Sequence, residues 1–173
     1  FKTAGGKPGT RHESNDATAE PTDPLPRRTT HEFWLLKILL SHDEILDWTR
    51  AHLHPEWIQN PVVREIVEHR LTIEDGHAVQ PAAILHRVNS DQARSLVTET
   101  LAEERPIPNP QQQLIDLVTR FRNESLDLEI AELTRSINSP ETPDTDQVGL
   151  IRERELLKSS KRAPLIPIVS EIS

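Results

Sequence analysis

The side chains best suited to chemistry in this sequence are its histidines and its acidic residues. His52 and His54 lie close to Glu56, and imidazole and carboxylate groups are common ligands of divalent metals. A metal site needs further ligands at a fixed geometry, and the neighbouring sequence offers none. The chain also has no Cys, so thiolate ligands and disulfide bonds are excluded. We therefore predict no metal site, and interpret the histidines as surface or structural residues.

Motifs for phosphate binding and acyl transfer are missing too. Gly5, Gly6 and Gly9 follow no strand and precede no helix, as a phosphate-binding loop would require. A serine hydrolase would need a Gly-x-Ser-x-Gly turn between a strand and a helix, and the sequence contains none. We predict that this segment is not an enzyme and has no catalytic residue, no cofactor and no small-molecule ligand.

The overall composition narrows the possible partners. The chain has 173 residues and a formal net charge of -8, which disfavours nonspecific binding to nucleic acid phosphates. Its longest apolar run, from Phe33 to Leu40, is interrupted by Lys37 and falls far short of the roughly 20 residues of a membrane helix. We expect a cytoplasmic protein that binds other proteins and has no membrane contact.

The distribution of residue types predicts an all-α fold that follows a flexible linker. Residues 1–28 are rich in Gly, Pro, Ser and Thr, and cannot bury enough apolar surface to fold. Helical periodicity begins at Thr29, and a bundle is expected over 29–122. Because the chain starts at Phe1 and has no Met, we expect it to be part of a longer polypeptide.

Local signals mark the beginnings of several helices. Thr29 and Glu32 have the spacing of a capping box, and Ser41 with Glu44 repeats it. Asn60 precedes a proline at the first helical position of a third helix. The apolar residues from Phe33 to Leu40 surround the first helix, which should therefore be the central one of the bundle.

Residues 110–138 form a long helical pattern whose apolar stripe changes direction. The stripe from Leu114 to Phe121 is turned by roughly 110° from the stripe of Leu126, Ile130, Leu133 and Ile137. Either the helix breaks near 122–124, or one long helix packs on two bodies. We predict a helical hairpin over 123–163, with a turn at 139–145, and a Pro-rich tail over 164–173.

The last helix carries apolar residues on two faces. Val148, Ile151 and Leu156 lie on one side, with Leu150 and Leu157 nearly opposite. A two-helix hairpin needs one apolar face, so the other is a candidate partner-binding surface; burial of both is the alternative. Residues 146–163 hold five basic and three acidic residues. The predicted surface consists of Leu150, Arg154, Leu157, Lys158, Lys161 and Arg162.

Five segments carry a resemblance to a known family. The run from Glu32 to Leu46, the segments 53–57 and 61–66, and the helices over 117–138 and 152–157 resemble the C-terminal domain of bacterial DnaG-type DNA primases. This resemblance covers about 29–163 and implies a helical bundle joined by a long helix to a helical hairpin. It also implies docking on the N-terminal domains of the hexameric replicative DNA helicase, which couples primer synthesis to fork unwinding.

The resemblance has consequences for the rest of the parent chain. A primase would carry its RNA-polymerising catalytic domain upstream of Phe1, and would meet single-stranded DNA through the helicase complex. Two alternatives remain open. The chain could be the N-terminal domain of a replicative helicase, or a nucleic-acid-binding helical module that uses Trp57 and the basic end of the last helix.

Overall fold

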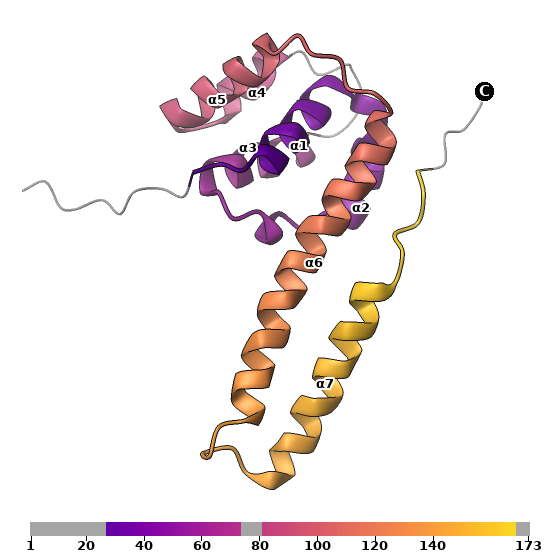
Figure 1. Cartoon of the computed structure of the whole chain (residues 1–173). Helices are drawn as coiled ribbons and strands as arrows, with labels where there is room; N and C mark the ends of the chain where they lie inside the picture. The colour runs from indigo at the N-terminus through magenta and orange to yellow at the C-terminus, as the bar shows by residue number, and fades with distance from the viewer. Residues whose placement is uncertain (1–26, 74–80, 169–173) are drawn as a thin grey trace, which may run out of the picture.

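The computed structural model describes residues 27–73 and 81–168 (Figure 1). These residues form α-helices and two short 3₁₀ helices with no β-strand among them, which confirms the predicted all-α fold. The α-helices are α1 (Thr30–Ser41), α2 (Leu46–His52), α3 (Pro61–Leu71), α4 (Pro81–Arg87), α5 (Asp91–Ala102), α6 (Pro110–Ile137) and α7 (Asp144–Arg162), and the 3₁₀ helices are η1 (Asp43–Ile45) and η2 (Pro55–Trp57). Most of the predicted linker, residues 1–26, lies outside the described residues.

Two of the predicted helix starts have the expected caps. At α1 the backbone N–H of Glu32 donates to Thr29 Oγ1 at 3.2 Å, and that of Thr29 donates to Glu32 Oε2 at 2.6 Å. The two bonds form the reciprocal capping box. At α3 the side-chain oxygen of Asn60 accepts from the N–H groups of Val62 and Val63.

The capping box predicted at Ser41 is wrong. Ser41 is the last residue of α1, and the chain passes through His42 directly into η1 without a side-chain cap. The N–H of His42 still donates to Ile38 O, as in a helical turn. The chain therefore tightens from α to 3₁₀ geometry, so Ser41 is not an N-cap residue and its hydroxyl has no helix start to cap.

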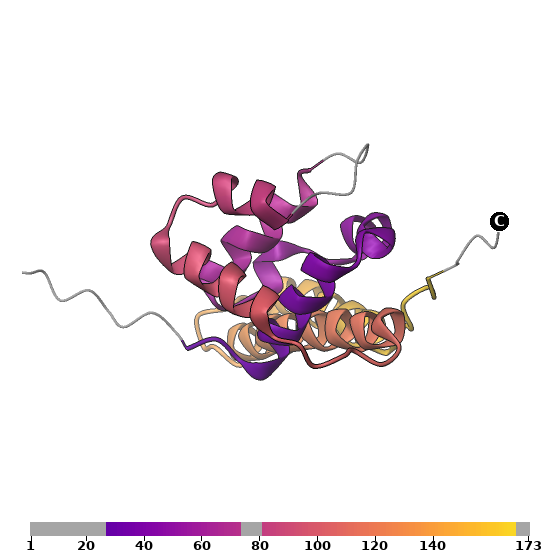
Figure 2. The ribbon, with the colours of Figure 1, turned by 90° about the horizontal axis from the view of Figure 1, so that it is seen from above.

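Helix α1 is the centre of the bundle, as its circumferential apolar pattern predicts. Every residue from Leu35 to Leu40 is buried, and so is the polar Glu32. Helices α3, α5 and the first half of α6 pack around α1 (Figure 2). The aliphatic residues of these three helices that are fully covered are Val63, Ile66, Val67, Ala93, Val97, Leu114 and Val118.

Two buried polar groups connect the helices of the bundle. The Glu32 carboxylate also accepts from the backbone N–H of Asn60 at 2.8 Å, so it joins the start of α1 to the start of α3. Arg70 on α3 is 1% exposed and donates from Nε to Leu39 O at 2.9 Å and from Nη2 to Asp43. The arginine thereby satisfies a carbonyl at the end of α1, which has no partner within its own helix.

Helix α6 is one continuous helix of 28 residues, which decides between the two alternatives for its turned stripe. Its first half buries Leu114, Leu117, Val118 and Phe121 against the bundle. Its second half extends beyond the bundle and lies beside α7 (Figures 1 and 2). One helix therefore packs on two bodies, and α7 forms the second arm of a protruding hairpin.

Candidate partner-binding hairpin

The seam of the hairpin is formed by matching stripes on α6 and α7. The α6 stripe consists of Leu126, Ile130, Leu133 and Ile137, all half-buried. On α7 the same spacing of four, three and four residues connects Leu150, Arg154, Leu157 and Lys161, which are also half-buried. At 100° per residue each stripe spans only about 60° of its helix, as in a short coiled coil.

This arrangement corrects the predicted surface of α7. Leu150 and Leu157 were expected on the free face, but they lie in the seam together with Arg154 and Lys161. Of the six predicted residues, Arg162 is exposed and Lys158 lies at the edge of the seam. Whether any of the six contacts a partner stays a prediction, and the two leucines are half-buried in the closed hairpin.

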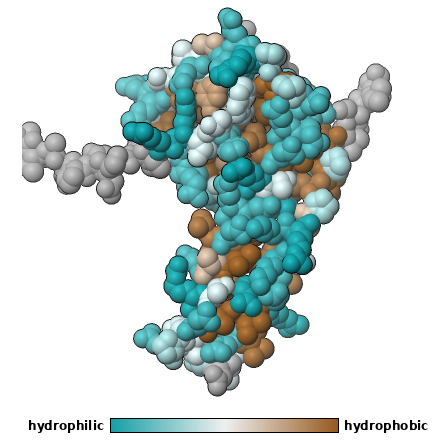
Figure 3. All heavy atoms as spheres, in the orientation of Figure 1, coloured by the Kyte–Doolittle hydropathy of each residue, from teal (hydrophilic) through white to brown (hydrophobic). Residues whose placement is uncertain are grey.

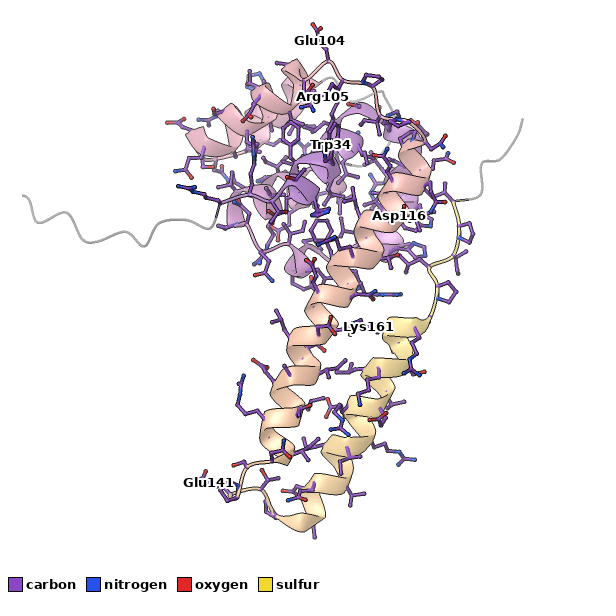
Figure 4. All side chains as sticks on the ribbon, viewed as in Figure 1. Trp34, Glu104, Arg105, Asp116, Glu141 and Lys161 are labelled. Atoms are coloured by element: carbon purple, nitrogen blue, oxygen red, sulfur yellow. The ribbon has the colours of Figure 1, made fainter. Side chains whose placement is uncertain are left out.

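The two basic residues of the seam, Lys161 and Arg154, have different hydrogen-bond partners. The Nζ of Lys161 lies 2.6 and 2.7 Å from the two carboxylate oxygens of Asp127, which holds the end of α7 to α6 (Figure 4). Arg154 donates from Nη2 to Glu155 on its own helix at 3.2 Å. Its Nε is buried and has no hydrogen-bond partner among the described residues. The hairpin therefore has an exposed ion pair between its helices at Lys161, and at its middle a buried donor without a partner, which costs free energy.

The free apolar residues of α7 lie on its outer face, which we define as Val148, Ile151 and Leu156. Their exposed fractions are 71%, 41% and 64%. Figure 3 shows hydrophobic surface on the hairpin, below the bundle. These are the residues that the sequence pattern assigned to the seam. Burying them would remove apolar area from water, which favours association.

Charged residues of α7 flank this outer face. Lys158 Nζ contacts Glu155 Oε1 at 2.8 Å, and the side-chain hydrogen bond from Lys158 lowers the pKa of the Glu155 carboxyl below its usual value. These two charges partly neutralise each other. Arg152 and Arg162 are exposed and form no ion pair with any described residue, so they are the cations of α7 most available to an acidic partner.

The histidine cluster considered as a metal site does not converge. His52 Nδ1 lies 2.8 Å from Trp48 O, and its ring stacks on the Trp48 indole with centroids 4.4 Å apart. His54 instead lies 3.4 Å from Glu56 and against the Trp57 ring. Within residues 27–73 and 81–168, no group of three or more His, Asp or Glu side chains is arranged to hold a metal ion.

A second charged cluster lies on the bundle, between α5 and α6. Glu103 accepts from the side chain of Arg105 at 2.8 and 3.1 Å and from its backbone N–H at 3.0 Å. These bonds lower the pKa of the Glu103 carboxyl to about 2. The guanidinium of Arg105 also lies over the Trp34 ring, 5.6 Å from its centroid (Figure 4). The cluster is satisfied within the chain and has the features of a structural clamp.

One signal for the correct seam was present in the sequence. The spacing of Leu150, Arg154, Leu157 and Lys161 repeats that of the α6 stripe, although two of its members are charged. A search for apolar residues alone misses such a stripe, because it ignores Arg and Lys. The long methylene stems of these basic side chains can also pack in a seam.

Comparison of the chain with protein-family models, with curated proteins and with solved structures returned no match. In the part of the chain that the structure describes, no helix combines the length and apolar character needed to cross a bilayer.

Proposed function

We propose that this chain is the helicase-interaction module of a bacterial DnaG-type primase. In this role it docks on the N-terminal domains of the hexameric replicative helicase and couples RNA primer synthesis to fork unwinding. The observation that carries the proposal is the hairpin itself, which extends from the bundle on the continuous helix α6 and leaves apolar residues uncovered (Figure 1). The arrangement agrees with the architecture that the primase resemblance implies.

The shape of the hairpin suits a docking role. Only the first half of α6 is needed to complete the bundle core, since Phe121 is the last buried residue of that helix. The remaining turns of α6, and all of α7, therefore add little to the bundle core. Their exposed apolar side chains cost solubility unless a partner covers them.

We assign the contact to the outer face of α7. Val148, Ile151 and Leu156 supply apolar area, and Arg152 and Arg162 supply cations beside it. The buried core of a protein interface is enriched in apolar area, and arginine is common among its energetically dominant residues. An apolar groove with acidic residues at its edge on the helicase would complement this face.

The test is size-exclusion chromatography with light scattering of the chain mixed with the hexameric replicative helicase of the same source. Co-migration is expected with the unaltered chain. Leu156→Ala should weaken binding by on the order of 2 kcal/mol if Leu156 is a central contact. The matched control is Leu128→Ala, because Leu128 is 57% exposed on α6 and does not belong to the outer face.

Two results would count against the proposal in different ways. An absent complex at tens of micromolar, from a folded chain, would refute the helicase partner. A complex that Leu156→Ala and Leu128→Ala weaken equally would leave the partner in place and refute the outer face as its docking surface.

A further inference from the structure

The segment after α7 continues alongside the bundle and contacts it (Figure 1). Residues 164–168, which we call the strap, continue from the end of α7 past α2 (Figure 1). The indole N–H of Trp48 on α2 donates to the carbonyl oxygen of Ile166 at 2.8 Å. Leu165 and Ile168 are partly buried against the core of the bundle. The strap therefore makes both polar and apolar contacts with a body that is remote in sequence.

The sequence of the strap determines its backbone conformation. Pro164 and Pro167 fix their own φ angles near −65° and restrict the residue before each of them to extended conformations. Ala163, the residue before Pro164, has φ −68° and ψ 126°, close to polyproline II geometry. Neither proline has an N–H group, so the strap is a poor strand and presents its carbonyls as acceptors.

The burial pattern of the strap has the three-residue period of a polyproline II helix. Leu165 and Ile168 lie three residues apart and are the two partly buried positions. Pro164 and Pro167, also three residues apart, are both exposed, and Ile166 is 68% exposed. One edge of the strap thus packs on the bundle, while the Ile166 carbonyl accepts from Trp48.

The bundle supplies a matching surface. Trp48 offers an aromatic ring and a donor on one side, and its ring is held in place by stacking on His52. Pro167 and Ile168 line a hollow of about 410 Å³ together with Ile115 of α6 and Glu44 of η1. An aromatic side chain that donates to a carbonyl of a Pro-x-x-Pro segment is a common mode of peptide recognition.

We propose that the surface around Trp48 is a recognition site for an extended Pro-x-x-Pro peptide, and that its occupant is this chain's own strap. The strap is a ligand bound in cis that ties the end of α7 to the bundle. A second tie supports it, because Arg122 on α6 donates to Ala163 O at 2.9 Å immediately before the strap. The hairpin is thereby braced at its base from two helices.

The experiment uses full-length variants and the indole N–H resonances of the three tryptophans in NMR spectra. Leu165→Ser combined with Ile168→Ser removes the packed edge of the strap and should release it. The Trp48 indole resonance should then move toward its position in an unstructured peptide and exchange faster with water. Ile166→Ser is the matched control, since the site uses only the backbone carbonyl of that residue, and it should leave the resonance in place.

Two further experiments test the proposal, and the second of them does not depend on chemical shifts. A synthetic peptide of residues 162–173, added at millimolar concentration to the released variant, should return the Trp48 resonance toward its original position, because cis attachment supplies an effective concentration in that range. Limited trypsin digestion should cut after Arg162 about fivefold faster in the released variant. Release removes the equivalent of one net hydrogen bond, and this raises the fraction of chains open to the protease by about that factor.

The proposal is overturned if the double variant leaves the Trp48 resonance unchanged, or if Ile166→Ser perturbs it as strongly. It is also overturned if the peptide has no effect in trans. Light scattering should give a monomer at all concentrations tested. A dimer that the double variant converts to a monomer would mean that the strap binds a second copy, which refutes the cis arrangement.

Discussion

The buried carboxylate of Glu32 offers the most direct test of how the bundle is held together. Its two oxygens accept from two backbone N–H groups, that of Thr29 at 2.6 Å and that of Asn60 at 2.8 Å. Glu32→Gln keeps the size and shape of the side chain but replaces one of these oxygens with an NH₂ group. Glutamine can still accept from Thr29, as it does in many capping boxes. The N–H of Asn60 then faces another donor.

The loss of stability expected for Glu32→Gln comes from the backbone N–H of Asn60, which loses its hydrogen-bond acceptor. Asn60 is 6% exposed, so water cannot readily replace the lost acceptor. A buried donor without a partner costs roughly 1–3 kcal/mol, and bonds to charged groups are at the upper end of that range. We expect Glu32→Gln to lower the free energy of unfolding by about 2–3 kcal/mol. With a urea dependence near 2 kcal/mol per molar, the midpoint should fall by about 1–1.5 M.

The assay is urea unfolding followed by tryptophan fluorescence. Trp34, Trp48 and Trp57 lie in α1, α2 and η2, so the signal reports on the bundle, with Trp48 also in contact with the strap. The matched control is Glu68→Gln, because Glu68 is exposed on α3, and it should change stability by less than about 0.5 kcal/mol. A midpoint for Glu32→Gln that coincides with that of Glu68→Gln would refute the bridging role.

Three further predictions concern the hairpin and the charged clamp. Leu157→Ala should destabilise the hairpin by on the order of 2 kcal/mol, because Leu157 lies in the seam. In thermal unfolding followed by circular dichroism, this variant should lose its helical signal at a lower temperature than the unaltered chain. Leu156→Ala should not, because Leu156 lies outside the seam. Equal melting of the two variants would contradict the corrected face. Lys161→Ala should cost less than about 1 kcal/mol by the same measurement, since its ion pair with α6 is solvent-exposed. Arg105→Ala should raise the pKa of Glu103 from about 2 toward 4.5, measured by side-chain carbon NMR against pH, because the mutation removes the guanidinium bonds that hold the carboxyl ionised. In the unaltered chain this interaction is present above pH 4.5 and is lost as the pH falls through 2.

Elements that depend on neighbouring residues could be predicted from the sequence. The capping box at Thr29 and the Asn60 cap each join groups two or three residues apart, so their geometry is set within one turn of chain. The circumferential apolar pattern of α1 likewise predicted its central position, since such a helix must be covered on all sides. The change of stripe along α6 indicated two packing partners, although it left the continuity of the helix undecided.

Tertiary structure decided the features that join remote residues. Glu32 finds its second donor 28 residues away, and Trp48 meets Ile166 across 118 residues. The face of α7 was also undecided, because its two stripes could each fill a two-helix seam. The seam chosen includes Arg154 and Lys161, since those side chains repeat the spacing of the α6 stripe and Lys161 can reach Asp127. Periodicity within one helix ranks the apolar faces, but only the register and charge of the facing helix select between them.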